Sequence, residues 1–171
     1  MNKDLTLKFR KIKLLALDFD GVMTDGFVYV DEDGKESVCC SRKDGFGIGM
    51  LKEAGIKVCV ISKEKNSVVA QRCEKLDISY YQNVGDGKGK LDVLKKVAVN
   101  KKIVFEEIAF MGDDINDSMV LKYAGVAVTV ADGHPAVKKN ADYITINNGG
   151  HHAVREVCEV ILKAKNISFL K

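Results

Sequence analysis

The 171-residue sequence lacks the features of a membrane, secreted or nucleic-acid-binding protein. No apolar run approaches the ~20 residues that a helix needs to cross a bilayer, and no apolar stretch long enough for a signal peptide precedes the first charged motif. The five cysteines are odd in number and include no C-x-x-C pair, which favours reduced intracellular thiols over disulfides or a zinc site. A net charge of +3 is too small to indicate nucleic acid as a partner. We therefore expect a cytoplasmic protein that binds neither membranes nor nucleic acid.

The chain also has no linker, internal repeat or low-complexity segment. Its 46% of hydrophobic and 30% of charged residues are usual for a globular protein. A length of 171 residues suits one compact domain with a sizeable core. We therefore expect a single domain that spans residues 1–171.

Short apolar runs alternate with segments of helical periodicity along the chain. The expected strands are 12–19, 56–62, 79–84, 106–112, 126–130 and 141–146. The expected helices are 44–55, 66–76, 88–99, 116–125 and 151–165. Asp44 is the expected N-cap of the first helix, and Gly55 is expected to end it. This alternation predicts an α/β fold, a Rossmann-like parallel sheet with helices on both faces.

Residues 26–40 break the alternation, because they form two strand-like pieces around a turn signal at 31–34. Such a pattern is typical of a β-hairpin. The pieces "FVYV" and "SVCC" are apolar, and in a monomer the edges of this hairpin would be exposed. We expect a hairpin flap after the first strand that pairs with another chain.

Aspartates gather at the ends of two predicted strands. Asp18 and Asp20 follow the first strand, and Asp113, Asp114 and Asp117 follow the fourth. Ligands of an open parallel sheet bind beyond the carboxyl ends of its strands, so these carboxylates should meet at one edge. Two unit charges about 4 Å apart repel by roughly 4 kcal/mol at an effective dielectric near 20, so a positive group should lie among them. Mg²⁺ suits an oxygen-rich cluster that acts on a phosphate.

Two motifs resemble a known superfamily of hydrolases. "DFDGVMTDG" is similar to the first motif of the haloacid dehalogenase superfamily, and "GDDINDSMVLKYAG" is similar to its last. The stretches "KDGFGIGMLKEAGI", "TVADGHPAVKKNADYIT" and "GGHHAVREVCEVIL" narrow the resemblance to one branch. This branch contains the cap-less phosphatases of 2-keto-3-deoxy sugar acid phosphates, typified by 3-deoxy-D-manno-octulosonate 8-phosphate phosphatase. The resemblance covers residues 12–163 and implies a haloacid dehalogenase-like fold without a cap domain.

The resemblance implies a role for each aspartate. Asp18 is similar to the nucleophile, which attacks phosphorus and forms an aspartyl-phosphate. Asp20 is similar to the general acid and base, which protonates the leaving alkoxide and then activates water. The family binds Mg²⁺ through the equivalents of Asp18, the main-chain carbonyl of Asp20, and Asp113. Asp114 and Asp117 are expected to support that set of ligands, although Asp117 could also simply brace a turn.

Two further residues resemble the phosphate-binding groups of the family. Ser62 corresponds to a hydroxyl that donates a hydrogen bond to the phosphate, with a role as a helix N-cap as the alternative. Lys90 corresponds to the lysine that neutralises the phosphate, with Lys88 as its rival.

The sequence departs from the branch at two places that bear on the substrate. The loop "SKEKNS" replaces the Thr-Gly-Arg usual in the octulosonate branch, and its Glu64 and Lys65 are more similar to relatives that act on nine-carbon, sialic-acid-type 9-phosphates. In "GGHHAVRE", His151 replaces an arginine that would suit a substrate carboxylate, and His152 replaces a glycine. Glu64, Lys65 and His151 are therefore the candidate specificity residues.

The predicted function is hydrolysis of a 2-keto-3-deoxy sugar acid phosphate with Mg²⁺ as cofactor. One alternative is the same chemistry on a nine-carbon 9-phosphate, because a fold does not fix a substrate. The other is a non-catalytic oligomerisation domain related to the C-terminal domain of sialic acid cytidylyltransferases. The presence of Asp18, Asp20 and Asp113 favours an enzyme. The resemblance further implies a homotetramer in which neighbouring hairpins roof the active sites.

Overall fold

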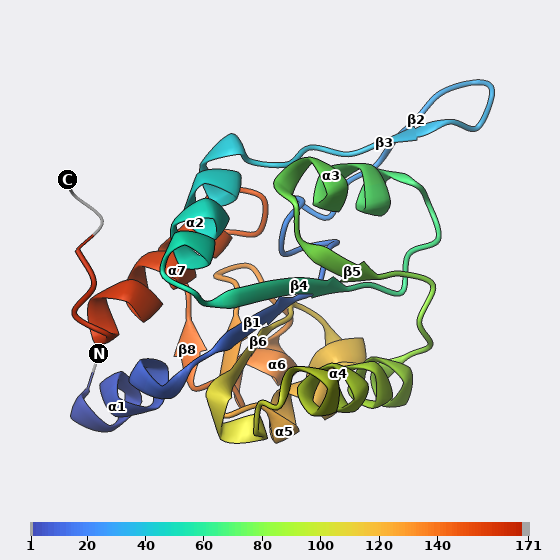
Figure 1. Cartoon of the computed structure of the whole chain (residues 1–171). Coiled ribbons are helices and arrows are strands. Elements are labelled where there is room, and N and C mark those ends of the chain that lie inside the picture. The colour runs from blue at the N-terminus through green and yellow to red at the C-terminus, as the bar shows by residue number, and fades with distance from the viewer. Residues whose placement is uncertain (1, 169–171) are drawn as a thin grey trace.

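A computed structural model describes residues 2–168 and contains a parallel sheet of six strands in the order β5-β4-β1-β6-β7-β8 (Figure 1). The strands are β1 (Leu14–Leu17), β4 (Lys57–Ile61), β5 (Ser79–Tyr81), β6 (Ile108–Met111), β7 (Val126–Thr129) and β8 (Tyr143–Ile144). β1, β6 and β7 are buried at every position, as expected for parallel strands that are covered on both faces. The predicted α/β fold is confirmed.

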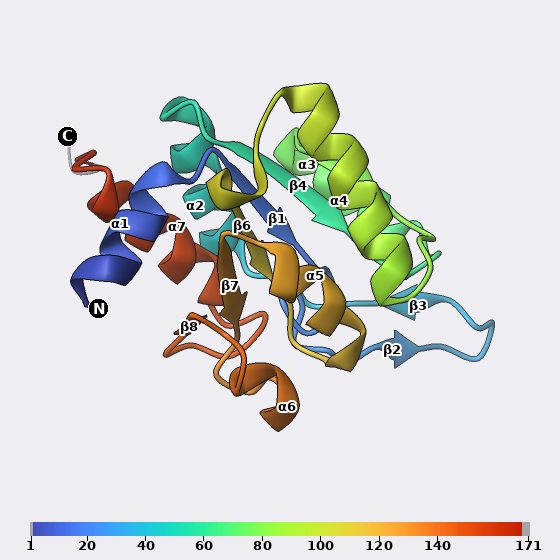
Figure 2. The ribbon, with the colours of Figure 1, turned by 90° about the horizontal axis from the view of Figure 1, so that it is seen from below.

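Helices cover both faces of the sheet (Figure 1, Figure 2). They are α1 (Lys3–Lys11), α2 (Arg42–Glu53), α3 (Val68–Leu76), α4 (Gly87–Lys101), α5 (Ser118–Tyr123), α6 (Pro135–Lys138) and α7 (Ala153–Ala164). Successive residues of β1 point to opposite faces, so Leu15 and Leu17 join the core under α2, α3 and α7, whereas Leu14 and Ala16 join the core under α4 and α5. Among residues 2–168, no helix combines the length and apolar character that crossing a bilayer requires.

The start of α2 differs from the expectation. Ser41, not Asp44, is the N-cap, and its Oγ accepts a hydrogen bond from the backbone N–H of Lys43. Asp44 lies inside the helix and is buried, and its carboxylate accepts a hydrogen bond from the backbone N–H of Arg155 in α7 at 2.8 Å. The Asp44 carboxylate therefore caps the start of α7, a helix far from it in the sequence.

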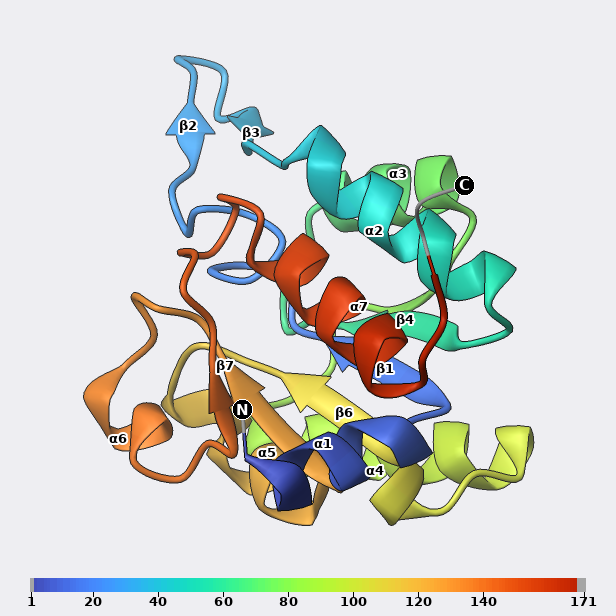
Figure 3. The ribbon, with the colours of Figure 1, turned by 90° about the vertical axis from the view of Figure 1, so that its left-hand side faces the viewer.

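The hairpin predicted at 26–40 is present, although its paired region is short. β2 (Tyr29–Val30) and β3 (Glu36–Ser37) form an antiparallel pair that projects away from the sheet (Figure 3). Within residues 2–168, these two strands pair only with each other. The neighbouring side chains of Phe27, Val28, Tyr29 and Val30 are all exposed. The role of the hairpin as a flap stays a prediction.

Candidate active site

The loops that follow β1, β4 and β6 meet at one edge of the sheet, because these strands are parallel and β1 lies between the other two. They enclose a pocket of about 470 Å³. Its walls are formed by Asp18, Asp20, Gly21, Gly26, Ser62, Lys63, Glu64, Lys65, Lys90, Asp113, Asp114 and Asn116. Most of the site residues predicted from the sequence therefore line one cavity.

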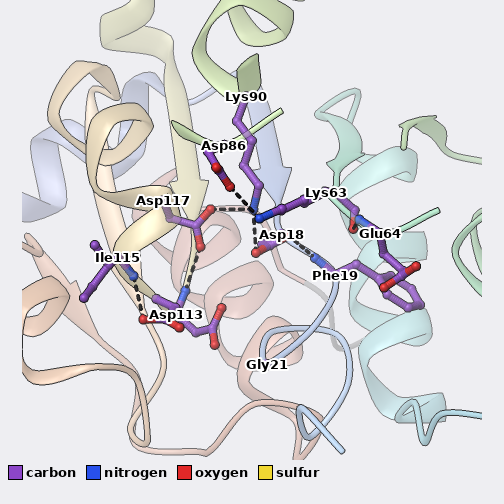
Figure 4. Close-up of polar contacts among 12 residues, drawn as sticks. Asp18, Phe19, Gly21, Lys63, Glu64, Asp86, Lys90, Asp113, Ile115 and Asp117 are labelled. Atoms are coloured by element: carbon purple, nitrogen blue, oxygen red, sulfur yellow. Dashed lines mark hydrogen bonds and ion pairs between the residues drawn. The ribbon is translucent and has the colours of Figure 1, made fainter. Parts of the chain in front are cut away.

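Lys90 supplies the positive group that the aspartate cluster requires (Figure 4). Lys90 lies in the first turn of α4 and is fully buried. Its Nζ lies 2.7 Å from Asp18 Oδ2 and 2.7 Å from Asp117 Oδ1. The other oxygen of Asp117 accepts a hydrogen bond from the backbone N–H of Asp113 at 3.1 Å. Lys88 is exposed and is not among the residues that line the pocket.

The same aspartates form a set of oxygen ligands that suits a divalent cation. One carboxylate oxygen from each of Asp18, Asp113 and Asp117 lies within 4.8 Å of the others. Hard oxygen donors of this kind fit Mg²⁺ or a similar ion. Both oxygens of Asp117 accept hydrogen bonds, from Lys90 and from the backbone N–H of Asp113. Both oxygens of Asp18 are likewise held, by the backbone N–H of Phe19 and by Lys90.

Gly21 makes room for this cluster. Its φ is +73°, and a Cβ atom at this position would overlap the carboxylate of Asp113. A side chain here would be strained by the backbone conformation and would also displace a candidate ligand. The glycine that follows Asp18-Phe19-Asp20 therefore allows the first loop to approach the last one closely.

Burial raises the pKa of the carboxyl groups in the site. Desolvation raises the pKa of Asp18 well above its usual value, and the Asp117 carboxylate adds to this against the opposing effect of Lys90. Desolvation, helped by the carboxylates of Asp117 and Asp114, raises the pKa of Asp113 to about 7. The pKa of Asp20 is raised by burial and then by Glu64. A bound divalent cation would favour the ionised forms instead.

These pKa shifts predict how the stability of the metal-free protein depends on pH. Between the unfolded pKa of an aspartate, about 3.9, and the folded pKa of Asp113, about 7, the folded state keeps a proton that the unfolded state has released. The free energy of unfolding should therefore fall as the pH rises through this window. We expect the melting temperature in a chelator to decrease from pH 5 to pH 8, and a saturating divalent cation to flatten the slope. A melting temperature that rises with pH in the chelator would contradict the raised pKa of Asp113. The variant Asp113→Asn should show a weaker dependence of melting temperature on pH.

The remaining predicted residues take different positions. Asp20 is half-buried at the pocket wall. Ser62 is buried at the end of β4, and its Oγ accepts a hydrogen bond from the backbone N–H of Glu64 at 3.0 Å. It does not cap α3, which begins six residues later at Val68. Asp114 is exposed and accepts a hydrogen bond from the backbone N–H of Ile115 at 2.7 Å.

The candidate specificity residues separate into two groups. Glu64 and Lys65 line the pocket, and one oxygen of Glu64 accepts hydrogen bonds from the backbone N–H groups of Lys65 and Asn66. His151 is not among the residues that line this pocket, and its Nδ1 lies 2.8 Å from the carbonyl oxygen of Gly149. Its role in specificity stays a prediction.

His152 has a backbone φ of +80°, a conformation that glycine adopts at little cost. The glycine that the resemblance places at this position would adopt the conformation at less cost than a histidine. A hydrogen bond to Ser41 holds the ring of His152, whose Nδ1 lies 2.9 Å from Ser41 Oγ.

Lys63 is a pocket residue that the sequence reading did not single out. Its Nζ forms an ion pair with Asp86 Oδ1 at 2.7 Å, and both side chains are largely exposed. The sequence could have indicated this position, because Lys63 directly follows Ser62, a predicted phosphate-binding residue. Asn116 also lines the pocket, but it follows Ile115 directly and carries no comparable signal.

Comparisons with known proteins agree with the fold and the motifs. The sequence model of the haloacid dehalogenase-like hydrolase family matches residues 61–157. The 3-deoxy-D-manno-octulosonate 8-phosphate phosphatase KdsC of Escherichia coli (strain K12) is 36% identical over 167 residues, which cover 96% of this chain and 87% of the relative. The enzyme of the same name from Salmonella typhi is 38% identical over 160 residues, which cover 92% of this chain and 83% of the relative.

Solved structures give the same result. The crystal structure of 3-deoxy-D-manno-octulosonate 8-phosphate phosphatase from Yersinia pestis has a TM-score of 0.93 and 35% identity, and the match covers 97% of this chain and 89% of that one. The Moraxella catarrhalis enzyme, crystallised with a magnesium ion, a phosphate ion and a KDO molecule, has a TM-score of 0.92 and 34% identity, with 97% and 94% covered. The chain therefore belongs to the haloacid dehalogenase-like hydrolases, in the branch of cap-less phosphatases that resemble 3-deoxy-D-manno-octulosonate 8-phosphate phosphatase.

Proposed function

We propose that this protein is a Mg²⁺-dependent phosphatase that hydrolyses the phosphate ester of a 2-keto-3-deoxy sugar acid, with 3-deoxy-D-manno-octulosonate 8-phosphate as the first candidate. The observation that carries the proposal is the convergence of Asp18, Asp20, Asp113 and Lys90 on one pocket at the carboxyl edge of the sheet. The relative from Moraxella catarrhalis, whose structure contains magnesium, phosphate and KDO, supports the same ligands here.

The proposed Mg²⁺ site consists of the carboxylates of Asp18 and Asp113 and the main-chain carbonyl of Asp20. Asp117 orients this set, because it contacts the backbone N–H of Asp113 and also Lys90. Asp114 lies at the rim of the pocket and adds negative charge. When bound, the cation neutralises the phosphate and keeps the carboxylates ionised.

In the proposed reaction, Asp18 is the nucleophile. One of its carboxylate oxygens forms a bond to phosphorus, and the bond from phosphorus to the sugar oxygen breaks. Asp20 gives its proton to that leaving oxygen and then takes a proton from the water that hydrolyses the aspartyl-phosphate. A raised pKa suits Asp20 to this task, because the group must hold a proton in the first step. Lys90 and the hydroxyl of Ser62 hold the phosphate oxygens.

A nine-carbon sialic-acid-type 9-phosphate is the second candidate substrate, and Glu64 is the observation that favours it. This carboxylate lies at the pocket wall. It can accept hydrogen bonds from sugar hydroxyls, and it would repel a substrate carboxylate that came close.

We also infer a homotetramer of single-domain subunits in the cytoplasm, in which hairpins of neighbouring chains roof the pockets. The exposed apolar side chains of the hairpin support this inference, because in an isolated chain they would face water. Asn66 Nδ2 donates a hydrogen bond to Glu36 at 3.0 Å, which connects the hairpin to the loop that carries Glu64. All five cysteines are free thiols, which agrees with a reducing compartment.

A phosphate-release assay tests the proposed function. We expect the purified protein to release phosphate from eight- or nine-carbon 2-keto-3-deoxy acid phosphates in the presence of Mg²⁺. Removal of divalent ions with a chelator should abolish turnover, and added Mg²⁺ should restore it, because the cation offsets the charge of several carboxylates. The ratio of kcat/KM for the two substrates decides between them. Full activity without a metal would refute the proposed role of Mg²⁺, and no release from any such ester would favour a non-catalytic domain.

A further inference from the structure

We propose that Glu156 is a positioning residue that sets the affinity of the active site for its divalent cation. Glu156 lies in the first turn of α7 and does not line the pocket. It acts through residues 145–150, which contact the loop that carries Asp18 and Asp20. One of its two measurements, phosphate release, rests on the proposed function. The main measurement, cation binding, does not.

The first step is the set of hydrogen bonds that Glu156 accepts. Its Oε1 accepts from the hydroxyl of Tyr143 at 2.8 Å and from the backbone N–H of Ile146 at 2.9 Å. Its Oε2 accepts from the backbone N–H of Asn147 at 3.1 Å and from the side-chain amide of Asn147 at 2.7 Å. Hydrogen bonds to an ionised carboxylate are stronger than those between neutral groups. One side chain therefore fixes the chain directly after β8.

Glu156 itself is held in a fixed position. The N-cap of α7, His152, makes no side-chain capping bond. Instead, Asp44 of α2 accepts a hydrogen bond from the backbone N–H of Arg155, the residue before Glu156. The start of α7 is thus tied to α2, and the carboxylate of Glu156 extends from a rigid base.

The second step is the contact of this segment with the catalytic loop. The backbone N–H of Gly150 donates to the carbonyl oxygen of Val22 at 3.1 Å. A Cβ atom on Gly149 would overlap the carbonyl oxygen of Gly21, so the two backbones touch directly. The backbone N–H of Gly149 also donates to Asp132 Oδ1 at 3.0 Å, which fixes it from the loop after β7.

The third step joins Gly21 to the proposed cation ligands. Gly21 contacts both groups: its carbonyl oxygen lies against Gly149, and a Cβ atom on Gly21 would overlap the carboxylate of Asp113. The peptide between Asp20 and Gly21 carries the carbonyl proposed as a ligand. Closely packed groups transmit a displacement instead of absorbing it. Loss of the Glu156 hydrogen bonds should therefore shift this carbonyl relative to Asp113 and weaken cation binding.

Glu156→Gln tests the inference, because glutamine has nearly the same shape but only one acceptor oxygen. We expect the Mg²⁺ concentration at half-saturation to rise roughly tenfold, as is usual when a group that supports metal ligands is lost. This concentration is measured from the Mg²⁺-dependent rise in melting temperature and from phosphate release. The kcat at saturating Mg²⁺ should stay within about twofold of the wild type, because the chemical groups are intact. Glu159→Gln is the matched control, since Glu159 lies on the same helix and pairs with Arg155.

A second pair of variants tests the other anchor if Glu156→Gln does not fold. Asp132 is exposed, so Asp132→Ala should fold, and it should raise the Mg²⁺ half-saturation because Gly149 loses its acceptor. Asp132→Asn keeps an acceptor oxygen and should have little effect, which separates geometry from charge. An unchanged Mg²⁺ half-saturation in folded Glu156→Gln would overturn the proposal. The thermal titration remains valid if the wild type releases no phosphate, so failure of the proposed function is recognised separately.

Discussion

Asp18→Asn should reduce phosphate release by about 10⁴-fold or more and, at the same time, should raise the melting temperature of the metal-free protein at pH 8. The loss of activity is expected because Asp18 is the proposed nucleophile and the covalent step cannot proceed without it. Stabilisation follows because burial and the Asp117 carboxylate raise the pKa of Asp18, which means that the folded state disfavours its charge. Asparagine has the same shape and no charge, and Lys90 keeps Asp117 as a partner.

The control for this variant is Asp92→Asn, on the exposed side of α4, which should change neither quantity. Phosphate release and thermal unfolding are measured on the same preparations. Near-normal turnover by folded Asp18→Asn would exclude the covalent mechanism. A lower melting temperature would show that the contact between Asp18 and Lys90 outweighs the desolvation of the carboxylate.

Lys90→Met should abolish activity and reduce the free energy of unfolding by roughly 3–5 kcal/mol at pH 8. Lys90 is fully buried between two carboxylates, so its removal leaves Asp18 and Asp117 without a cation. The destabilisation should shrink toward pH 5, because burial raises the pKa of Asp18 and this carboxylate can then take up a proton in the folded state. Denaturant unfolding at the two pH values measures this difference.

Lys88→Met is the matched control, because Lys88 lies two residues away on the same helix and is exposed. It should keep both stability and turnover. A second variant, Lys90→Met combined with Asp117→Asn, should recover part of the lost stability by removing one unpaired charge. Equal effects of the Lys88 and Lys90 substitutions would contradict the buried ion pairs.

The sequence could predict that aspartates gather in one pocket, because the evidence for their positions is local. Asp18, Asp20 and Asp113 each follow an apolar run, and parallel strands bring their carboxyl ends together. The choice between Lys88 and Lys90 remained open in the sequence, although two residues on a helix point about 200° apart and only one can face a site. The structure places Lys90 there.

Other features depend on contacts between distant residues and leave little local signal. Asp44 resembled an N-cap, but its carboxylate bonds to Arg155, more than a hundred residues away. α1 was not predicted because it buries only Phe9, and α6 was not predicted because it is four residues long. For Asp117 the sequence predicts support of the metal ligands or of a turn, but not the pairing with Lys90, which joins separate segments of the chain.

The charges on the pocket wall have a kinetic consequence. The carboxylates there are Asp18, Asp20, Glu64, Asp113 and Asp114, and the amines are Lys63, Lys65 and Lys90. A phosphate monoester carries about −1.5 to −2 charge. Above the raised pKa values of Asp18 and Asp113, where these groups are ionised, it would enter a pocket wall of its own sign if no cation were bound. Substrate binding should therefore follow a compulsory order in which the cation enters first and the ester second. Free Mg²⁺ would then control how often a collision between enzyme and substrate is productive.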